Sequence, residues 1–529
     1  MINNVAHISF DEIPHLSSKD KLYQSEADAY HGFYKYSAKL ESFGDVISER
    51  KKFNNRRDLL VNVLLRQYES ESQDSNILSV IKSLRDENTF TVTTAHQPVL
   101  FLGPLYVVYK ILSTIHLSQI LKEQYPDFNF VPVFVSGGED HDLEEVATMH
   151  IFNRDITWKT GQTGSVGRMS LADLEDPLTE LIDLFGQSPY AEELESIIRK
   201  SLAASNTYGE FNINLYKSLF THLGLVVLNM DDRELKKELL PYTVKEIESK
   251  ISFKTVTDTQ IKLAGNGIKE QAHVREINLF SFGEGTRDRI IEGNGQFSIG
   301  EQNFSKDELI EFISKHPENI SPNVVMRPIY QELILPNLAY IGGGGEIAYW
   351  LERLDQFASF DIPFPVLVRR NSAMIVNANI QKNLNKVDLK SKDFFRAKDD
   401  LIKYYLSQNT EGDYSLQDET EELELFFKKL AAKAKTIDPS LEKYTLAEGA
   451  KHSKILKSIS NKMTKAAKNK NEVQLQKVQN IQSKLFPHGK LQERYDNFIP
   501  YYLKYGKAWF DALLVHLNPM DKDFIIIEE

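Results

Sequence analysis

The sequence contains no cysteine among its 529 residues. This absence excludes disulfide bonds, thiolate zinc sites and cysteine nucleophiles, so any chemistry must use imidazole, carboxylate, hydroxyl or backbone groups. The sequence also lacks any run of about 18 uninterrupted apolar residues, the length that a membrane helix requires. Its first residues include Asp11 and Glu12 and carry neither the basic start nor the long apolar run of a secretory signal. We therefore expect a cytoplasmic protein that has no membrane partner.

The chain also has fewer basic than acidic residues, with 63 Lys and Arg against 75 Asp and Glu, which gives a net charge of −12. An acidic chain disfavours general nucleic-acid binding, so we predict no nucleic-acid partner. Hydrophobic residues make up 41% of the chain and charged residues 26%, which is the balance of a globular protein. The length exceeds the roughly 250–300 residues at which a single core stops growing, so at least two packed units are expected.

The clearest structural pattern lies between residues 90 and 135. Residues 90–94 and 130–135 are rich in β-branched and aromatic side chains, which is typical of buried strands. Between them, residues 96–103 have the composition of a loop, and the sequence from Pro104 to about Leu121 predicts a helix that is apolar nearly all round. A strand, a buried helix and a second strand form a βαβ unit.

Further strands are predicted at residues 225–228 and 365–368, with helices between them. We therefore predict an α/β core with a doubly wound sheet in residues 1–378, interrupted by an insertion at about 150–325. From about residue 380 strand-forming residues become rare, whereas Lys, Glu and Gln become frequent. This change predicts a separate C-terminal α-helical domain with a coiled coil in residues 379–529.

One apolar stripe stands out in the C-terminal domain. Ile455, Ile459, Met463 and Ala466 lie on one face of a predicted helix whose other faces carry lysines. Such a stripe must pack against another segment, and the apolar residues at 423–430 could form an antiparallel hairpin with it. A hairpin still leaves apolar surface uncovered, and two-fold pairing is the commonest way to cover it. We therefore predict a homodimer through the coiled coil.

Polar side chains follow both strands of the βαβ unit. They are His96 and Gln97 after the first strand, and Glu139, Asp140, His141 and Asp142 after the second. Because ligands of open α/β sheets bind beyond the carboxyl ends of the strands, these side chains should meet at one crevice. Two imidazoles and three carboxylates can hold a magnesium ion on a nucleotide, orient an amine or supply a general base. Asp142 has an alternative interpretation as a helix N-cap, with Glu145 as its partner three residues later.

Four consecutive glycines at residues 342–345 precede Glu346 and a predicted helix. Their amides can bind an anion, and Gly343, Gly345 and Ala348 fit the G-x-G-x-x-A form of the dinucleotide fingerprint. Two features argue against a dinucleotide, since the charge of Glu346 would repel a pyrophosphate and no βαβ unit frames the motif at the proper distance. A carboxylate at this position could instead bind an amino or hydroxyl group, and close packing of backbone against the sheet is the structural alternative.

Three arginines are candidate anion-binding side chains. Arg327, with Asn323 four residues upstream, is flanked by Met326 and Pro328, and a guanidinium there can bind a carboxylate or a phosphate through two parallel hydrogen bonds. A structural salt bridge would account for Arg327 equally well. Arg369-Arg370 follows the strand predicted at 365–368 and could bind a 2′-phosphate under the dinucleotide interpretation.

Four segments occur in an order and at a spacing that match one known family. They are Thr94-Ala95-His96-Gln97-Pro98 with Gly103-Pro104-Leu105-Tyr106 and Tyr109-Lys110, Glu139-Asp140-His141-Asp142-Leu143-Glu144-Glu145-Val146, Ile320-Ser321-Pro322-Asn323 through Arg327-Pro328, and Ala339-Tyr340-Ile341-Gly342-Gly343 with Gly345-Glu346-Ile347-Ala348-Tyr349-Trp350. Leu491-Gln492-Glu493-Arg494 and Tyr505-Gly506 extend the match to almost the whole chain. In these segments the chain resembles the BshC family of bacillithiol biosynthesis. The family usually has Thr-Gly-Gln-Gln where this chain has Thr94-Ala95-His96-Gln97, so Gln97 carries over more firmly than His96.

The resemblance implies a Rossmann-like core, related in layout to class I nucleotidyl-transferring folds, and a C-terminal coiled coil that forms a homodimer. It implies a ligase that joins the carboxyl group of L-cysteine to the amine of glucosaminyl-malate and so forms bacillithiol. A carboxylate does not acylate an amine at neutral pH without activation, so ATP is the expected co-substrate, through an adenylate or an acyl phosphate. Whether Mg²⁺ accompanies the ATP is left open, and we expect no tightly bound cofactor and no metal ligands.

The resemblance and the positions of the loops together predict two groups of site residues. The catalytic group is His96, Gln97, Asp140, His141 and Asp142. The substrate- or nucleotide-binding group is Gly103, Pro104, Tyr106, Glu139, Asn323, Arg327, Gly343, Gly344, Gly345 and Glu346. The sequence also leaves two other functions open, an NADP-dependent oxidoreductase that uses the glycine loop and a noncatalytic nucleotide-binding scaffold that dimerises through its helical arm.

Overall fold

The computed structural model describes residues 2–14, 16, 21, 23, 28–69, 75–409 and 416–529. The chain divides into two compact units, unit 1 with Met1–Met374 and Leu491–Ile527, and unit 2 with Ile375–Lys490 and Glu528–Glu529. This division differs from the predicted boundary at 378/379 because the last part of the chain returns to unit 1. The reason is apolar burial, since Phe498, Trp509 and Phe510 of this returning segment are each at most 1% exposed.

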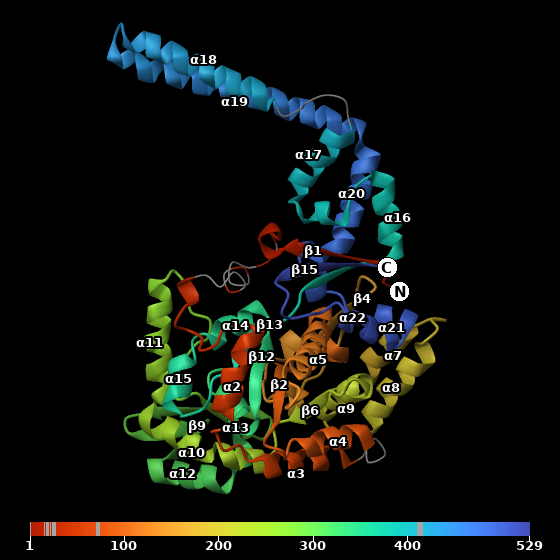
Figure 1. The fold of residues 1–529 in the computed structure, drawn as a ribbon, viewed down its shortest axis with the longest axis vertical. Helices are drawn as coiled ribbons and strands as arrows, with labels where there is room; N and C mark the ends of the chain where they lie inside the picture. The colour runs from red at the N-terminus through yellow and green to blue at the C-terminus, as the bar shows by residue number, and fades with distance from the viewer. Residues whose placement is uncertain are drawn as a thin grey trace. The chain divides into compact units, whose positions relative to one another are not determined.

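A five-stranded parallel sheet forms the centre of unit 1 (Figure 1). Its strands in spatial order are β13 (Val366–Arg369), β12 (Asn337–Gly342), β2 (Thr89–His96), β3 (Asn129–Ser136) and β6 (Val226–Asn229). Numbered along the chain this order is 5-4-1-2-3, so the strand order reverses between β2 and β12. This is the arrangement of a Rossmann-like doubly wound sheet. The predicted fold class is therefore confirmed.

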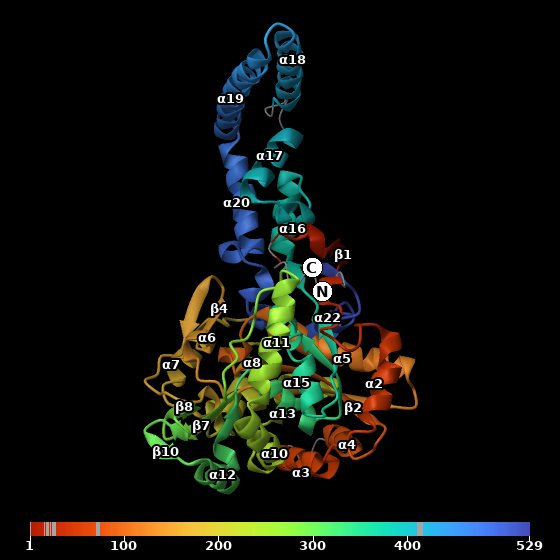
Figure 2. The ribbon, with the colours of Figure 1, turned by 90° about the vertical axis from the view of Figure 1, so that its left-hand side faces the viewer.

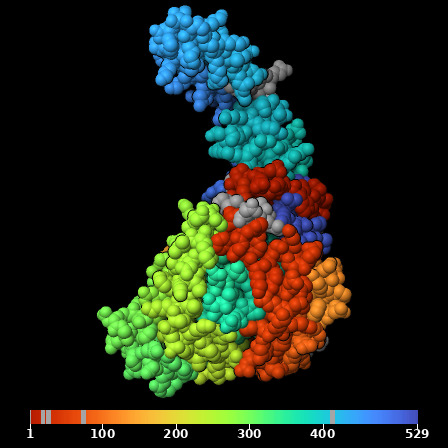
Figure 3. Space-filling view, turned by 60° about the vertical axis from the view of Figure 1, so that its left-hand side comes forward, coloured from red at the N-terminus to blue at the C-terminus, as the bar shows by residue number. Residues whose placement is uncertain are grey.

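Helices cover both faces of the central sheet, so its strands are buried on both sides and can be apolar along their whole length. One face packs against α2 (Phe43–Arg50) and α5 (Leu105–Gln124). The other face packs against α3 (Arg57–Gln67), α4 (Ser75–Ser83), α10 (Arg233–Ser249), α13 (Arg327–Ile334), α14 (Gly344–Trp350) and α15 (Leu354–Ser359). The space-filling view shows the orange-red, teal and yellow-green segments of unit 1 side by side on one face, although they are far apart in the sequence (Figure 3).

Two excursions interrupt the sheet, where one insertion at about 150–325 was predicted. β6 lies inside the predicted insertion and divides it, because this short apolar strand adds to the sheet beside β3. The first excursion contains α6 (Leu143–Val146), β4 (Thr148–Ile151), β5 (Arg154–Thr157), η6 (Val166–Arg168), α7 (Glu175–Asp183), α8 (Ala191–Ala203) and α9 (Tyr208–Phe220). The second contains α10, α11 (Ile251–Gly265), β7 (Leu279–Gly283), β8 (Thr286–Gly293), β9 (Gln296–Ile299), β10 (Gln302–Phe304), α12 (Lys306–Lys315), η8 (Pro317–Asn319), β11 (Ile320–Pro322) and α13. Its strands form an antiparallel sheet in the order β10-β9-β8-β7-β11.

A strained turn, η5 (Leu100–Leu102), directly precedes α5. Phe101, Leu102 and Gly103 all have positive φ, at 46°, 66° and 59°, and a bulky residue in this conformation costs on the order of 1–3 kcal/mol. The buried side chain of Asn497 stabilises the turn, since its Nδ2 donates to the carbonyls of Phe101 at 3.1 Å and Gly103 at 2.7 Å. The returning C-terminal segment therefore fixes where α5 begins.

The remaining elements of the returning segment are η11 (Gln492–Arg494), α21 (Ile499–Tyr505), α22 (Ala508–Leu514) and β15 (Asp523–Glu528). β15 pairs in a three-stranded sheet of order β1 (Asn4–Ser9), β15 and β14 (Ala373–Val376). In the described part of the chain, no helix is both long enough and apolar enough to pass through a bilayer.

Unit 2 is helical and contains α16 (Ala378–Val387), α17 (Lys398–Asn409), α18 (Gln417–Lys435), α19 (Pro439–Lys470) and α20 (Glu472–Leu485). Figures 1 and 2 show α18 and α19 side by side, as their packing requires. The antiparallel hairpin predicted from the apolar stripes is thus confirmed. Gly449 lets the two helices approach, because a Cβ there would lie 2.7 Å from the ring of Phe427.

Candidate active site

A cavity of about 450 Å³ opens at the carboxyl ends of the central strands, beside the reversal point between β2 and β12. This is where ligands bind in doubly wound sheets, and the volume is typical of a small-molecule site. We call this cavity the crevice. It is lined by Ala95, His96, Gln97, Tyr106, Val135, Ser136, Gly137, Glu139, Asp140, Glu145, Met230, Asp231, Arg287, Pro322, Asn323, Val324, Arg327, Tyr330, Gly343, Gly344, Gly345, Glu346, Tyr349, Arg370 and Arg494.

The crevice brings together most of the predicted site residues. They are His96, Gln97, Tyr106, Glu139, Asp140, Asn323, Arg327, Gly343, Gly344, Gly345 and Glu346. Four predicted residues are not part of the lining, namely Gly103 and Pro104, which directly precede α5, and His141 and Asp142. The rule that places ligands at strand ends therefore located the crevice, but it did not separate the side chains that face the cavity from their neighbours.

Asp142 caps a helix, as the alternative interpretation of its sequence position allowed. Its Oδ1 accepts a hydrogen bond from the backbone N–H of Glu145 at 3.2 Å, at the start of the one-turn helix α6. His141 is exposed, and its Nδ1 contacts the Arg287 guanidinium at 3.1 Å. Because a guanidinium can only donate, the Nδ1 atom of His141 accepts this hydrogen bond.

Of the acidic loop, residues 139–142, Glu139 and Asp140 line the crevice, and Asp140 is the more exposed of the two. Its Oδ2 accepts from Gln97 Nε2 at 2.7 Å, and its Oδ1 lies 3.5 Å from the Arg287 guanidinium. The side chain is 43% exposed, so it remains accessible to a ligand. Gln97 and Asp140 come from the ends of neighbouring strands, and their hydrogen bond joins the two predicted loops.

The glycine loop is organised around a buried lysine. Lys110 of α5 is fully buried, and its Nζ lies 2.8 Å from Glu346 Oε2 and donates to the Ala95 carbonyl at 2.5 Å. Glu346 also accepts from the Gly343 N–H at 2.9 Å and from the Tyr340 hydroxyl at 2.7 Å. Burial alone would raise the pKa of Glu346, but the charge and hydrogen bond of Lys110 outweigh it and lower the pKa to about 2. Glu346 is therefore a fixed anion.

The dinucleotide interpretation of this loop needs one correction. β12, α14 and β13 do form a parallel βαβ unit around the motif, contrary to the prediction, which did not include β12 among the strands. The argument from Glu346 holds, since its carboxylate already occupies the Gly343 N–H that a pyrophosphate would need. A Cβ on Gly342 would lie 3.1 Å from the Tyr340 ring, whereas Gly345 has open space around it. Close packing therefore explains Gly342 but leaves Gly345 free for a ligand.

His96 is neutral at the reversal point. Its burial, with the charge of Lys110 as a second cause, lowers its pKa to about 4. Its Nδ1 lies 3.0 Å from the Gln97 carbonyl, so Nδ1 carries the proton and donates, and Nε2 accepts from the Tyr106 hydroxyl at 2.8 Å. Burial also raises the pKa of Tyr106 to about 12, so its hydroxyl stays protonated. His96 and Tyr106 are therefore uncharged polar groups that could form hydrogen bonds with a ligand.

Guanidinium groups also line the crevice. Arg327 donates to Gln331 Oε1 at 3.4 Å, and neither Arg327 nor Arg494 has a carboxylate within ion-pair distance among the described residues. Arg370 donates to the buried Glu493 at 2.8 Å and lies over the Tyr106 ring, 5.1 Å from its centroid. Arg327 and Arg494 are therefore available to an anionic ligand. The side chain of Asn323 is used internally, since its Oδ1 accepts from the N–H groups of residues 325 and 326.

Sequence reasoning missed four charged residues of the lining, which are Glu145, Asp231, Arg287 and Arg494. Glu145 was considered only as the capping partner of Asp142. Asp231 follows the predicted strand at 225–228, so the strand-end rule could have found it. Arg494 lies in the Leu491–Arg494 segment that carried part of the resemblance, although no role was given to it. Arg287 lies on β8 of the antiparallel sheet, and no sequence motif around it indicates a position at the crevice. In the part of the chain that is described, no group of three or more His, Asp or Glu side chains has an arrangement that could hold a metal ion.

Comparison with known proteins agrees with this architecture. The family profile described as "Bacillithiol biosynthesis BshC, N-terminal Rossmann-like domain" matches residues 4–371, and "Bacillithiol biosynthesis BshC, C-terminal coiled-coil domain" matches residues 373–529. A relative from Flavobacterium johnsoniae is 36% identical over 98% of this chain and 99% of its own length, and one from Christiangramia forsetii is 34% identical over 98% of both chains. A relative from Bacillus anthracis is 30% identical over 88% of this chain and 89% of its own length. All three bear the name "Putative cysteine ligase BshC". With both domains matched along nearly the whole sequence, the chain belongs to the BshC family.

Proposed function

We propose that this chain is a cysteine ligase that forms an amide bond between the carboxyl group of L-cysteine and the amine of glucosaminyl-malate, giving bacillithiol, with ATP as the activating co-substrate. The observation that carries the proposal is a crevice lined by both carboxylates and guanidinium groups, within a chain of this family. Such a crevice suits substrates that carry both an amine and carboxylates.

The charges of the proposed substrates have counterparts among the lining residues. Glucosaminyl-malate carries one amine and two carboxylates, and cysteine carries an amine and a carboxylate. Asp140 and Glu139 are suited to the amines, and Arg327 and Arg494 to the carboxylates. Among the described residues Arg327 and Arg494 have no carboxylate partner, which supports an anionic ligand beside them.

ATP supplies activation of the cysteine carboxyl group when it binds. The phosphates need cationic or N–H donors, and the same guanidinium groups and the open backbone at Gly345 provide them. Both an adenylate and an acyl phosphate are compatible with this set of donors. Since ATP and free cysteine are metabolites of the cell interior, the proposed reaction is cytoplasmic.

We further propose that the active form is a homodimer through the hairpin of unit 2. The hairpin leaves large apolar side chains exposed on its surface, including Phe426 at 59%, Ile455 at 56% and Ile459 at 44%. Phe426 and Ile455 line one groove on α18 and α19. A second copy of the same helices would cover this surface. Light scattering should give twice the mass of the chain, and Ile455→Asp with Ile459→Asp should give a folded monomer. A wild-type monomer at micromolar concentration would contradict the proposal.

The direct test supplies the purified chain with L-cysteine, glucosaminyl-malate, ATP and Mg²⁺, and detects bacillithiol by mass spectrometry. Release of AMP identifies an adenylate, whereas release of ADP identifies an acyl phosphate. Nucleotide binding without product would favour a noncatalytic scaffold, and NADPH binding an oxidoreductase. A deletion strain should accumulate glucosaminyl-malate and lack bacillithiol. Normal bacillithiol in that strain, with no product in vitro, would refute the proposal.

Two variants of the acidic loop sharpen this test. Asp140→Asn removes a half-exposed charge that lines the crevice, and it should abolish product formation with little change in stability. Asp142→Asn is the matched control, because asparagine caps a helix as well as aspartate does. Wild-type activity in Asp140→Asn would show that the site is misplaced, and loss of activity in Asp142→Asn would give Asp142 a catalytic role beyond its cap.

A further inference from the structure

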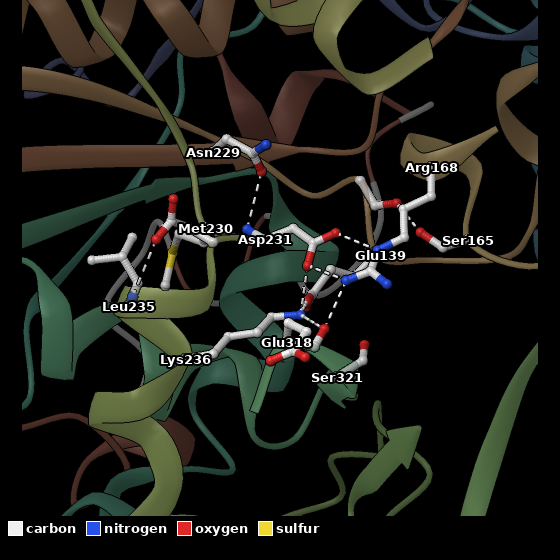
Figure 4. A network of polar contacts seen from close by, with 12 residues as sticks. Glu139, Ser165, Arg168, Asn229, Met230, Asp231, Leu235, Lys236, Glu318 and Ser321 are labelled. Atoms are coloured by element: carbon white, nitrogen blue, oxygen red, sulfur yellow. Dashed lines mark hydrogen bonds and ion pairs between the residues drawn. The ribbon is translucent and has the colours of Figure 1, made fainter. Parts of the chain in front are cut away.

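Four charged side chains form a group beside the crevice, which we call the charge cluster (Figure 4). Lys236, Glu139 and Asp231 are largely buried, whereas the Arg168 side chain is 37% exposed. Glu139 follows β3, Asp231 follows β6, Lys236 lies in the first turn of α10 and Arg168 ends η6. The Lys236 ammonium is 1% exposed and lies 2.5 Å from Glu139 Oε1 and 2.6 Å from Asp231 Oδ1. Glu139 and Asp231 also line the crevice, so both carboxylates of the cluster are within reach of a ligand bound there.

The two carboxylates of the charge cluster are held very differently. Asp231 accepts from Arg168 Nε and Nη2, both at 2.7 Å, and from Lys236 at 2.6 Å. Glu139 contacts only Lys236 among these cations. Burial raises the pKa of Glu139, whereas the Lys236 charge and the Arg168 hydrogen bonds overcome burial and lower the pKa of Asp231. Two neighbouring carboxyl groups whose pKa values are pushed apart are suited to different roles, one fixed in charge and one able to exchange a proton.

The cations of the cluster are not free to turn toward a substrate. Arg168 lies over the Phe282 ring, 3.8 Å from its centroid, and Lys236 lies 4.8 Å from the same centroid. Arg168 also donates to the Glu318 carbonyl at 2.7 Å, and Lys236 to the same carbonyl at 3.3 Å. These contacts hold Arg168 and Lys236 in place, so the two cations orient the carboxylates of Glu139 and Asp231.

This inference rests on the proposed function. We propose that Glu139 is the general base of amide formation and that Asp231, Lys236 and Arg168 are positioning residues that hold its carboxylate toward the amine of the glucosaminyl substrate. The amine nitrogen attacks the carbonyl carbon of the activated cysteinyl group, and its N–H proton passes to the Glu139 carboxylate. The new C–N bond forms as the bond from that carbon to the phosphate oxygen breaks, and the oxygen leaves with the electron pair. A base whose pKa lies closer to neutrality than that of a surface carboxylate suits this transfer.

The surroundings of Glu139 define how its ionisation can be changed. The charged or titratable groups that face it are Lys236 from α10, Asp231 after β6, Arg168 from η6, Arg287 from β8 and Tyr330 from α13. Lys236 makes the shortest contact and is the strongest of the influences that lower the pKa of Glu139. Removing its charge should therefore raise the pKa of Glu139 and move the acidic limb of the rate profile to higher pH.

The test compares Glu139→Gln, Lys236→Met and Lys236→Arg in the full chain, with L-cysteine, glucosaminyl-malate and ATP. Glu139→Gln should lower kcat at least 100-fold, within the range for loss of a general base, and leave KM for glucosaminyl-malate within about threefold. Lys236→Met should shift the acidic limb of kcat upward in pH, and Lys236→Arg should restore it. Tryptophan fluorescence checks that each variant is folded. Glu234→Gln is the matched control, since it removes an ion pair with Lys237 on the outer side of the same helix.

Three distinct outcomes would contradict the inference or the proposed function on which it rests. If the wild-type chain forms product and Glu139→Gln keeps its kcat within about threefold, Glu139 is not the base, while the ligase function stands. If the pH profile of Lys236→Met coincides with that of the wild type, the charge cluster does not tune the reaction. If the wild-type chain forms no product, the proposed function itself fails. Calorimetric binding of glucosaminyl-malate to Glu139→Gln distinguishes a lost base from a lost binding site.

Discussion

The buried pair of Lys110 and Glu346 gives the sharpest quantitative prediction. Glu346→Gln removes one charge at the reversal point and leaves the Lys110 ammonium, which is fully buried, without its partner. The variant keeps the size and shape of the side chain, so the packing of α14 should survive. We expect a lower free energy of unfolding for unit 1, because an uncompensated buried charge is strongly destabilising.

The magnitude follows from the ionisation of Glu346. Its pKa falls from the ordinary 4.5 to about 2 in the folded chain. At about 1.4 kcal/mol for each pH unit, this difference is worth about 3 kcal/mol at pH 7. The side chain is 26% exposed, so solvent screens part of the interaction. We therefore expect Glu346→Gln to lose about 2–3 kcal/mol at pH 7.

The sign of the pH dependence is fixed by the direction of the shift. A carboxylate with a lowered pKa stabilises the folded state above its unfolded pKa, and this contribution disappears as the pH falls toward the folded pKa. For Glu346 the window runs from about 4.5 down to about 2. The difference in unfolding free energy between the wild type and Glu346→Gln should therefore shrink by about 1 kcal/mol between pH 7 and pH 3.5.

Urea denaturation followed by tryptophan fluorescence measures this difference. All three tryptophans, Trp158, Trp350 and Trp509, are buried in unit 1, so the signal reports that unit alone. Glu284→Gln, at an exposed turn, is the control for the substitution itself. The double variant Lys110→Met with Glu346→Gln should recover part of the lost stability. A loss below about 1 kcal/mol at pH 7, or one that does not change with pH, would refute the reasoning.

Three further predictions concern other parts of the chain. Asn497→Ala should lose about 1–3 kcal/mol of unfolding free energy in unit 1 and speed hydrogen exchange in the turn before α5, because two carbonyls of a strained turn lose their donor; unchanged exchange would contradict this. Arg50→Met should lose about 3–5 kcal/mol because it leaves Glu332 buried and unpaired, and adding Glu332→Leu should restore much of it in urea melts. Gly449→Val should separate α18 from α19 and lower the melting temperature of unit 2, measured by circular dichroism. The tryptophan signal of unit 1 should not change. An unaltered melting temperature would show that the hairpin tolerates the clash.

The sequence by itself determined the α/β class, the strands β2, β3, β6 and β13, and the hairpin of unit 2. These features depend on short-range patterns, namely apolar runs for buried strands and three- or four-residue spacings for helix faces. Because ligands of a doubly wound sheet bind at its carboxyl edge, the positions of the strands also located the loops that carry His96, Gln97 and Asp140. Residues next to a strand end were therefore predictable as neighbours of the crevice.

Only the tertiary structure decided which of those residues face the crevice and what completes it. Asp140 points into the cavity whereas Asp142, two residues later, caps a helix, and no local pattern separates the two. Arg287 and Arg494 come from an antiparallel strand and from the returning C-terminal segment, nearly 200 and 400 residues away from His96 along the chain. Their positions depend on long-range packing, such as the two hydrogen bonds from Asn497 that fix the start of α5. The periodicity of the sequence indicates which face of a helix or strand is buried. The site is formed by contacts between elements that are distant in the sequence, and these contacts depend on the whole fold.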